Sequence, residues 1–198
     1  MKTLIIGEII NNNLSSGTLE ILGKAKSMDL EPQVITVGSD DGPAIGLNDI
    51  KQTYIKRSNT SLNFTKVASK ITEIIKNEDI KLILGSSTYM CRDLISFISV
   101  DLNSSPVSNV IDFNLQDGKV TTVNSINGGE SLYKAKINSD HSLLLIRPKA
   151  FDPAEVELNT DYETIDVDNS DIEVFDIYIE KLMRHLSEAK KWSRYSDF

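Results

Sequence analysis

The chain has 198 residues, of which 40% are hydrophobic, and a formal net charge of −8 at pH 7. This length and apolar content fit one globular domain with a sizeable core. No run of eighteen apolar residues occurs and Cys91 is the single cysteine, which argues against a membrane span, excludes an internal disulfide and is typical of a cytoplasmic protein.

The first half of the chain alternates apolar strands with amphipathic helices. Strand patterns occur at residues 3–7, 33–38, 52–57 and 81–85. Apolar residues at helical spacing predict helices after the capping residues Ser15 and Ser16, over residues 62–77, and after residues 86–90. Apolar strands separated by helices predict a parallel sheet that is covered on both faces.

From residue 107 onward the predicted elements are strands joined directly by turns. The expected strands are residues 109–115, 119–126, 131–137 and 142–148, with glycine-, asparagine- and aspartate-containing turns between them. No helix separates them, so they should run largely antiparallel. The predicted fold is therefore a three-layer α/β/α, Rossmann-like unit with a mostly parallel sheet and an appended antiparallel meander, over residues 1–151.

The negative charge is concentrated after this unit. Between Asp152 and Glu180 the chain has eleven acidic residues and no lysine or arginine, so the remainder is slightly basic. Residues 152–172 contain Pro153 and little periodicity, and they are interpreted as an acidic linker on the surface. Residues 173–198 are expected to form a C-terminal helix and a tail. This helix is basic but lacks interleaved stacking aromatics, so nucleic-acid binding is not expected.

Motifs for catalysis and for metal binding are missing from the sequence. There is no Gly-x-Ser-x-Gly elbow, no Walker loop and no carboxylate pair in a defined frame. His141 and His185 have no cysteine or acidic residue at ligand spacing, so no metal site is proposed. Cys91 lies on an apolar helix face and is interpreted as a buried small hydrophobic residue rather than a reactive thiol. No catalytic residue is assigned, and an enzymatic role is left open but not favoured.

Small and polar residues directly follow three of the predicted parallel strands. In an open α/β sheet, ligands bind outside the carboxyl ends of the strands, where hydroxyls and free amides can hold a phosphate or an adenine nucleotide. The same residue types also serve strand-to-helix turns and helix caps without any ligand. Both interpretations apply to the candidate residues, which are Gly7, Glu8, Gly38, Ser39, Gly85, Ser86, Ser87 and Thr88.

Three stretches carry a family resemblance. They read TLIIGE from Thr3, ILGSSTYMCRDLISFISVDLNSSPVSNVIDF from Ile83, and LLIRPKAFDPA from Leu144. In order and spacing they resemble the N-terminal domain of the electron transfer flavoprotein alpha subunit, with its adenine nucleotide alpha hydrolase-like fold. Gly85–Thr88 stands at the family's Pro-Ala-Thr-Thr-like loop, and Arg147–Phe151 matches its Arg-Pro-x-Ala-Phe word. The resemblance covers roughly residues 1–154.

The chain also departs from the family pattern. Residues 124–130 read NSINGGE where the family has an Arg-Pro-Ile-Tyr-Ala-Gly-Asn-like strand, so the role of that Arg and Tyr is in doubt here. In the family a second domain holds FAD and opens with a strand and a Gly-Gly-Arg-Gly turn. Residues 192–198 read WSRYSDF and supply neither an apolar run nor a glycine. The expectation is that this chain alone does not bind FAD.

Three hypotheses follow. The leading one is an alpha-subunit-related scaffold that pairs with a beta-type subunit, or with itself, and takes part in electron transfer only when another chain supplies the flavin. The second is a free-standing regulatory module that binds an adenine nucleotide such as AMP in the strand-end crevice. In the family the adenine nucleotide is bound by the beta subunit. The third is an ordinary alpha subunit truncated in its sequence.

Overall fold

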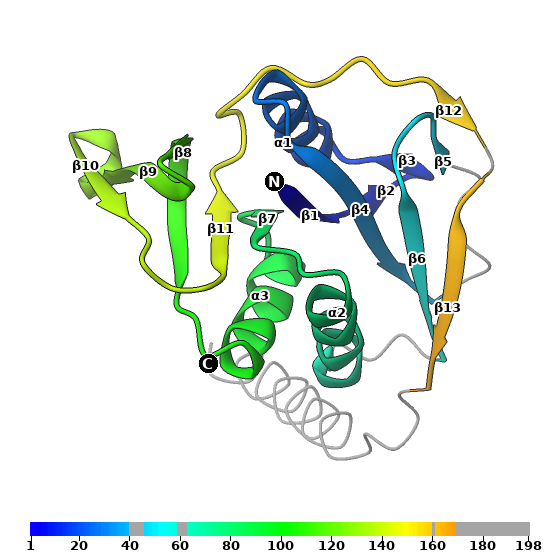
Figure 1. The fold of residues 1–198 in the computed structure, drawn as a ribbon. Helices are drawn as coiled ribbons and strands as arrows, with labels where there is room; N and C mark the ends of the chain where they lie inside the picture. Colours follow the sequence, from blue (N-terminus) through cyan, green and yellow to red (C-terminus); the bar gives the residue numbers. More distant parts are fainter. Residues whose placement is uncertain (40–45, 59–62, 160, 169–198) are drawn as a thin grey trace, which may run out of the picture.

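The computed structural model describes residues 1–39, 46–58, 63–159 and 161–168 (Figure 1). The expected C-terminal helix, with His185, lies outside these residues. The described helices are α1 (Ser16–Ser27), α2 (Thr65–Asn77) and α3 (Tyr89–Asp101), with a short 3₁₀ turn at Asn127–Gly129. The described strands are β1 (Lys2–Gly7), β2 (Ile9–Ile10), β3 (Asn13–Leu14), β4 (Glu31–Gly38), β5 (Gly46–Leu47), β6 (Gln52–Arg57), β7 (Leu82–Ser86), β8 (Pro106–Gln116), β9 (Lys119–Ile126), β10 (Ser131–Lys136), β11 (Ser142–Ile146), β12 (Leu158–Asn159) and β13 (Glu163–Val167).

A nine-stranded sheet forms the middle layer. Its strand order is β10-β9-β8-β11-β7-β1-β4-β6-β13. The seven strands β8, β11, β7, β1, β4, β6 and β13 are parallel to their neighbours among themselves. In this sheet the antiparallel pairs are those of β9 with β8 and with β10. Helix α1 covers one face, and α2 and α3 cover the other (Figure 1). The expected three-layer α/β unit with a mostly parallel sheet is therefore confirmed.

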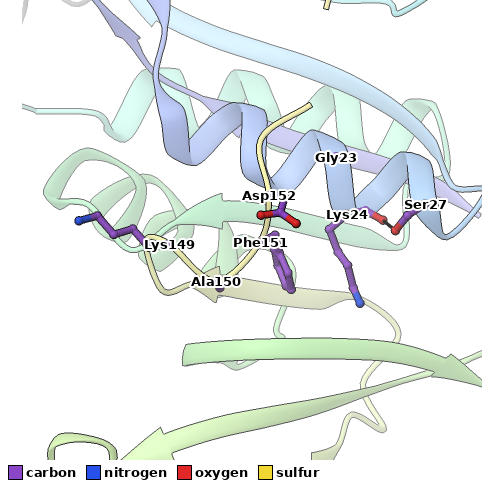
Figure 2. A pocket seen from close by; sticks show the side chains of 7 residues that line it. All are labelled: Gly23, Lys24, Ser27, Lys149, Ala150, Phe151 and Asp152. Carbon is purple, nitrogen blue, oxygen red and sulfur yellow. Dashed lines mark hydrogen bonds between the residues drawn. The ribbon is translucent and has the colours of Figure 1, made fainter. Parts of the chain in front are cut away.

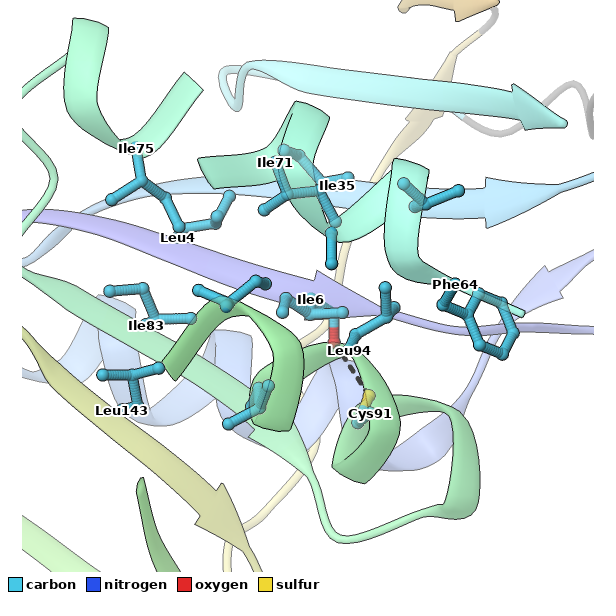
Figure 3. Close-up of a cluster of buried hydrophobic side chains, with 14 of the residues drawn as sticks. Leu4, Ile6, Ile35, Phe64, Ile71, Ile75, Ile83, Cys91, Leu94 and Leu143 are labelled. Carbon is cyan, nitrogen blue, oxygen red and sulfur yellow. Dashed lines mark hydrogen bonds between the residues drawn. The ribbon is translucent and has the colours of Figure 1, made fainter. Parts of the chain in front are cut away.

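Alternating side chains of the strands fill two separate apolar cores. In β1, Leu4 and Ile6 face α2 and α3, whereas Ile5 faces α1, and all three are at most 1% exposed. Figure 3 shows the first core, where Ile71 and Ile75 of α2 lie over the strands. Burial on both faces explains why these strands read as continuous apolar runs rather than as alternating patterns.

The expected meander is confirmed for three strands and corrected for the fourth. β8, β9 and β10 form an antiparallel unit, but β11 pairs parallel with both β7 and β8. All five residues of β11 are buried, which requires a neighbour strand on each side and cover on each face. An outlying strand of a meander does not provide this environment.

The antiparallel unit folds back over the α1 face of the sheet. β8 starts beside β11, with Pro106 opposite Leu143, and reaches the carboxyl edge near Val110, where the register shifts. The turn between β8 and β9 nevertheless lies beside Met1 and Ser142, at the amino edge of the parallel strands. The arm, defined as residues 110–137, therefore returns across the sheet and packs Phe113, Val120 and Ile137 into the core beneath α1.

The segment interpreted as an acidic linker contributes strands in its described part. β12 pairs with β5, and β13 joins the sheet as its outer strand beside β6. In β13, Ile165 and Val167 are partly buried, while Glu163 and Asp166 are exposed. An edge strand can form with only a weak apolar alternation, and its carboxylates can remain in water. The acidic composition of this segment is therefore compatible with a strand, although it gives no clear strand pattern.

None of the described helices is long and apolar enough to cross a membrane.

Candidate functional site

The eight candidate residues lie together at the carboxyl edge of the sheet. They end or directly follow β7, β1 and β4, which are consecutive neighbours in the sheet. The chain leaves β1 through α1 toward one face and leaves β7 through α3 toward the other, so the topological switch point lies between these two strands. A crevice at this point is the expected ligand site of an open α/β sheet.

Two helices begin at this crevice, each with a hydroxyl cap. Ser15 Oγ accepts a hydrogen bond from the backbone amide of Thr18 at 3.2 Å, and Thr88 Oγ1 accepts one from the amide of Cys91 at 3.3 Å. Each cap satisfies one of the backbone donors that a helix start leaves open. The predicted capping role of Ser15 is confirmed, and Thr88 has the same role on α3.

Glu8 connects the two helix starts. Its Oε1 accepts a hydrogen bond from Thr88 Oγ1 at 2.7 Å, and its carbonyl oxygen accepts one from the amide of Ser15 at 2.8 Å. Its own amide donates to Thr18 Oγ1 at 3.0 Å. A carboxylate near helix N-termini is electrostatically favourable, so this residue holds the crevice together across the switch point.

The backbone amides of the loop after β7 donate hydrogen bonds to other groups of the protein. The amide of Ser87 donates to the carbonyl oxygen of Ile146 at 2.8 Å, and that of Thr88 donates to Ser86 at 2.7 Å. Arg92 donates from Nε and Nη2 to Ser87 Oγ at 3.2 and 2.9 Å. These groups stabilise the start of α3 and the neighbouring strand, and they are the groups that a phosphate would otherwise engage.

The three candidate glycines each have a packing reason to lack a side chain. A Cβ on Gly7 would lie 3.0 Å from the methyl groups of Thr18 and Val34. A Cβ on Gly85 would lie 3.0 Å from Ile95, and one on Gly38 would overlap the hydroxyl of Tyr54. Close approach of side chains, rather than of a ligand, therefore accounts for these glycines.

Cys91 is a core residue, as its pattern indicates. It is fully buried on α3, and its thiol donates a hydrogen bond to the carbonyl oxygen of Ile6 at 3.6 Å (Figure 3). Burial and, secondarily, the negative charge of Glu8 raise the pKa of Cys91 to about 12. The thiolate is the reactive form of cysteine, so the raised pKa disfavours reaction of this side chain at neutral pH.

His141 directly precedes β11. Burial and the nearby charge of Lys81 lower its pKa, which keeps the imidazole neutral at pH 7. No group of three or more histidine, cysteine or acidic residues that could hold a metal ion occurs among the described residues.

A second feature, which the sequence pattern did not indicate, lies between α1 and the segment after β11. An open pocket of about 430 Å³ is lined by Gly23, Lys24, Ser27, Lys149, Ala150, Phe151 and Asp152 (Figure 2). Lys24 Nζ lies 2.8 Å from Asp112 Oδ1 and 5.2 Å from the ring centre of Phe151. Glu20 Oε2 accepts a hydrogen bond from the amide of Lys149 at 2.8 Å.

These contacts give the Arg-Pro-Lys-Ala-Phe motif at residues 147–151 a structural role. Residues 147–154, called the latch below, tie the end of β11 to α1, and the amide of Ala154 donates to the carbonyl oxygen of Leu19 at 2.9 Å. Lys149 has a φ of 64°, a left-handed conformation that lets the chain turn back onto α1. The sequence identified this word as a family signature, but its contact with a helix more than a hundred residues earlier requires the fold.

Comparison with known proteins adds a family assignment. Residues 3–172 match the sequence profile described as the electron transfer flavoprotein domain. Over 135 residues the chain is 24% identical to the "Putative electron transfer flavoprotein subunit YdiR" of Escherichia coli (strain K12). This similarity covers 68% of the chain but 43% of the relative, so the match spans less than half of that protein's length.

Proposed function

The chain belongs to the electron transfer flavoprotein domain family, and from this premise we propose that it is an alpha-type scaffold domain. In this role it pairs with a beta-type subunit and contributes to electron transfer through that pairing. The FAD of the working complex is then held outside the strand-end crevice. Its single, buried cysteine suits the reducing environment of the cytoplasm, where we place this complex.

The state of the crevice is the observation that carries this proposal. A dinucleotide is gripped by backbone amides at a helix N-terminus beside a glycine-rich turn. Here the amides of Ser87 and Thr88 donate to protein carbonyls, and the carboxylate of Glu8 lies between the helix starts. The crevice therefore favours a structural over a ligand-binding role, which supports the scaffold over the free-standing AMP-binding module.

The outer face of α3 supports a role in subunit pairing. Tyr89 is 89% exposed and Val100 is 78% exposed, and Phe97 is also exposed beside them. Tyr89 and Val100 are eleven residues apart and therefore lie on the same side of α3. This side is opposite the one that carries the buried Cys91 and Ile98. Large apolar side chains gathered on one helix face are typical of protein interaction sites. We assign this face to the beta-type subunit.

The test is the mass and the absorbance of the purified protein. We expect a one-to-one complex with a beta-type subunit from the same organism by size exclusion with light scattering. We also expect no flavin absorbance from the chain alone. Val100→Asp should weaken the complex about tenfold or more, since a charge is placed in an apolar contact. Ser69→Asp, on the exposed side of α2, is the matched control and should leave it unchanged.

Three results would contradict the proposal. The chain alone carries stoichiometric FAD, or no complex forms with the beta-type subunit, or both substitutions weaken the complex equally. A chain that associates only with itself would exclude the beta-type partner and would count among these contradictions. Stabilisation of the chain alone by AMP would favour the regulatory module instead, because a ligand that binds only the folded state raises Tm.

A further inference from the structure

We propose that a small pocket at the amino edge of the sheet binds a free oxyanion of the phosphate and sulfate class. The pocket has a volume of about 120 Å³ and lies between the starts of β7 and β11, the turn from β8 to β9, and the segment from β10 to β11. This edge is opposite the strand-end crevice, and the pocket shares no residue with α3. The site therefore goes beyond the proposed function, and either can fail without the other.

Ser142 contributes a buried hydroxyl to this pocket. The residue is 7% exposed and lines the pocket, and its backbone amide donates to the carbonyl oxygen of Lys81 at 2.8 Å. Its hydroxyl has no hydrogen-bond partner within the described part of the chain. Buried polar groups are normally hydrogen-bonded to the protein, to water or to an ion. The Ser142 hydroxyl is thus a donor that the described fold leaves for a ligand in the pocket.

Two lysines add ammonium donors to the lining. Lys81 Nζ lies 2.8 Å from Asp79 Oδ1, and Lys119 Nζ donates to Asn138 Oδ1 at 3.2 Å. An ammonium has three N–H donors, so each lysine retains donors beyond these contacts. Asp140 also lines the pocket but is exposed to water, so the lining has two lysines against one solvated carboxylate. This excess of positive charge favours an anion, and charge-assisted hydrogen bonds to oxyanions are strong.

The volume of the pocket limits the size of that anion. Pockets for organic ligands usually have about 300–1,000 Å³, whereas this one has about 120 Å³. This equals the liquid volume of about four water molecules, which suits an ion with four oxygen atoms. The buried side chains of Val120 and Ile137 form an apolar part of the wall, where charges attract more strongly than in water. The pocket therefore fits a phosphate or sulfate ion rather than a nucleotide.

A bound oxyanion would connect the arm to the parallel strands. Lys119 belongs to the arm, whereas Lys81 directly precedes β7 and Ser142 begins β11. An anion that accepts hydrogen bonds from all three bridges parts of the chain that are far apart in sequence. Because the unfolded chain does not hold these groups together, the ion binds the folded state and stabilises it.

Two substitutions test the lining, each with a matched control. Lys119→Gln removes one positive charge and keeps an amide that can bond to Asn138, and Lys134→Gln removes the charge of an exposed lysine of β10 outside the pocket. Ser142→Ala removes the hydroxyl that has no described partner. Ser131→Ala, at an exposed position of β10, is its control.

NMR shifts of the backbone amides are followed while phosphate, sulfate or AMP is added at constant ionic strength set with chloride. We expect phosphate and sulfate to cause saturable shifts in the wild-type chain, largest at residues 117–120 and 137–142, with millimolar affinity. We expect no saturable shift at these residues with AMP. Lys119→Gln and Ser142→Ala should each weaken phosphate binding about tenfold, since each removes a charge-assisted contact. Lys134→Gln and Ser131→Ala should keep the wild-type affinity.

Three outcomes would overturn this assignment. Phosphate causes no saturable shift at these residues, which would mean that the pocket holds water only. Each control weakens binding as much as its matched variant, which would mean that the ion is attracted by the general charge of the protein. AMP shifts the same residues with the affinity of phosphate, which would mean that the site accepts a larger ligand. If Lys119→Gln does not fold, Ser142→Ala and its control decide the matter.

Discussion

The two faces of the sheet are covered by different kinds of structure. One face carries α2 and α3, which pack through a continuous apolar core. The other carries α1, the arm and the latch, where apolar packing is combined with polar contacts across long sequence distances. Lys24 of α1 pairs with Asp112 of the arm, and Glu20 accepts a hydrogen bond from the latch residue Lys149.

This difference indicates where the family signature acts. On the α2/α3 face, local amphipathic patterns suffice to form the cover, since each helix presents an apolar stripe to the strands. On the α1 face, one helix is too small to cover the strands, and the arm and latch complete the layer. The signature word therefore belongs to the face that depends on long-range contacts.

The largest expected effect tests how tightly the α2/α3 face is closed. The thiol of Cys91 is buried beneath α3, so alkylation requires the protein to open. We expect iodoacetamide to label the native chain at pH 8 about a thousandfold or more slowly than the chain in urea, in line with the stability of ordinary domains. Mass spectrometry measures both rates, and comparable rates would contradict a closed core.

The raised pKa of Cys91 also predicts a pH dependence. Between about pH 9 and pH 12 the unfolded thiol loses its proton while the folded thiol keeps it, so the free energy of unfolding falls as pH rises through this window. Cys91→Ala should show a weaker fall over the same range. Identical slopes for the two proteins would contradict this assignment.

The third prediction concerns packing on the same face. Ile71 of α2 is fully buried, and Ile71→Ala should lower the free energy of unfolding by about 2–5 kcal/mol through lost burial and a residual cavity. Urea denaturation measures this change. Because the core is continuous, hydrogen exchange should accelerate in α2, α3 and the central strands together. Acceleration confined to α2 would show that the face isn't one cooperative unit.

The fourth prediction concerns the latch. A Cβ on Gly23 would lie 2.7 Å from the backbone oxygen of Asp152, so Gly23→Ala should push the latch away from α1. We expect a loss of about 1–2 kcal/mol, since overpacking outweighs the better helix propensity of alanine. Hydrogen exchange should accelerate mainly in residues 148–157. Lys26→Ala, at an exposed position of α1, is the control, and a more stable Gly23→Ala variant would contradict the latch contact.

The parallel core was predictable because its signals are local. The strands around β1 and the helices α1 and α3 follow from apolar runs, helical spacing and capping residues. The differences are small shifts of element ends, such as the start of α2 at Thr65 and the start of β4 at Glu31. The position of β11 and the return of the arm depend on which strands become neighbours, and a local pattern does not contain this information. β13 was missed because its acidic residues conceal a short alternation.

The candidate crevice was predictable as a place but not in its internal contacts. The rule for strand ends brought Gly7, Gly38 and Gly85 to one edge of the sheet, as the fold confirms. The hydrogen bond between Glu8 and Thr88 joins residues eighty positions apart, and only the folded chain reveals it. The sequence therefore located this edge of the sheet, and the structure supplied its internal contacts.

The smallest expected effect concerns the amino edge that both faces share. The hydrogen bond from Lys51, at 2.6 Å, chiefly lowers the pKa of Glu78, and Gln33 donates a second one at 2.9 Å. A lowered pKa stabilises the fold above about pH 4, and this contribution is lost as the pH falls further. Glu78→Gln should therefore cost less than about 1 kcal/mol at pH 7, because the pair is partly exposed, and less still at pH 3. Equal costs at both pH values in urea denaturation would contradict this.

The most direct test of the closed crevice is a crystal of the wild-type chain soaked in AMP. The electron density should show Glu8 in contact with Thr88 and no nucleotide between the starts of α1 and α3. A phosphate group bound at that position, with the carboxylate displaced, would contradict the account.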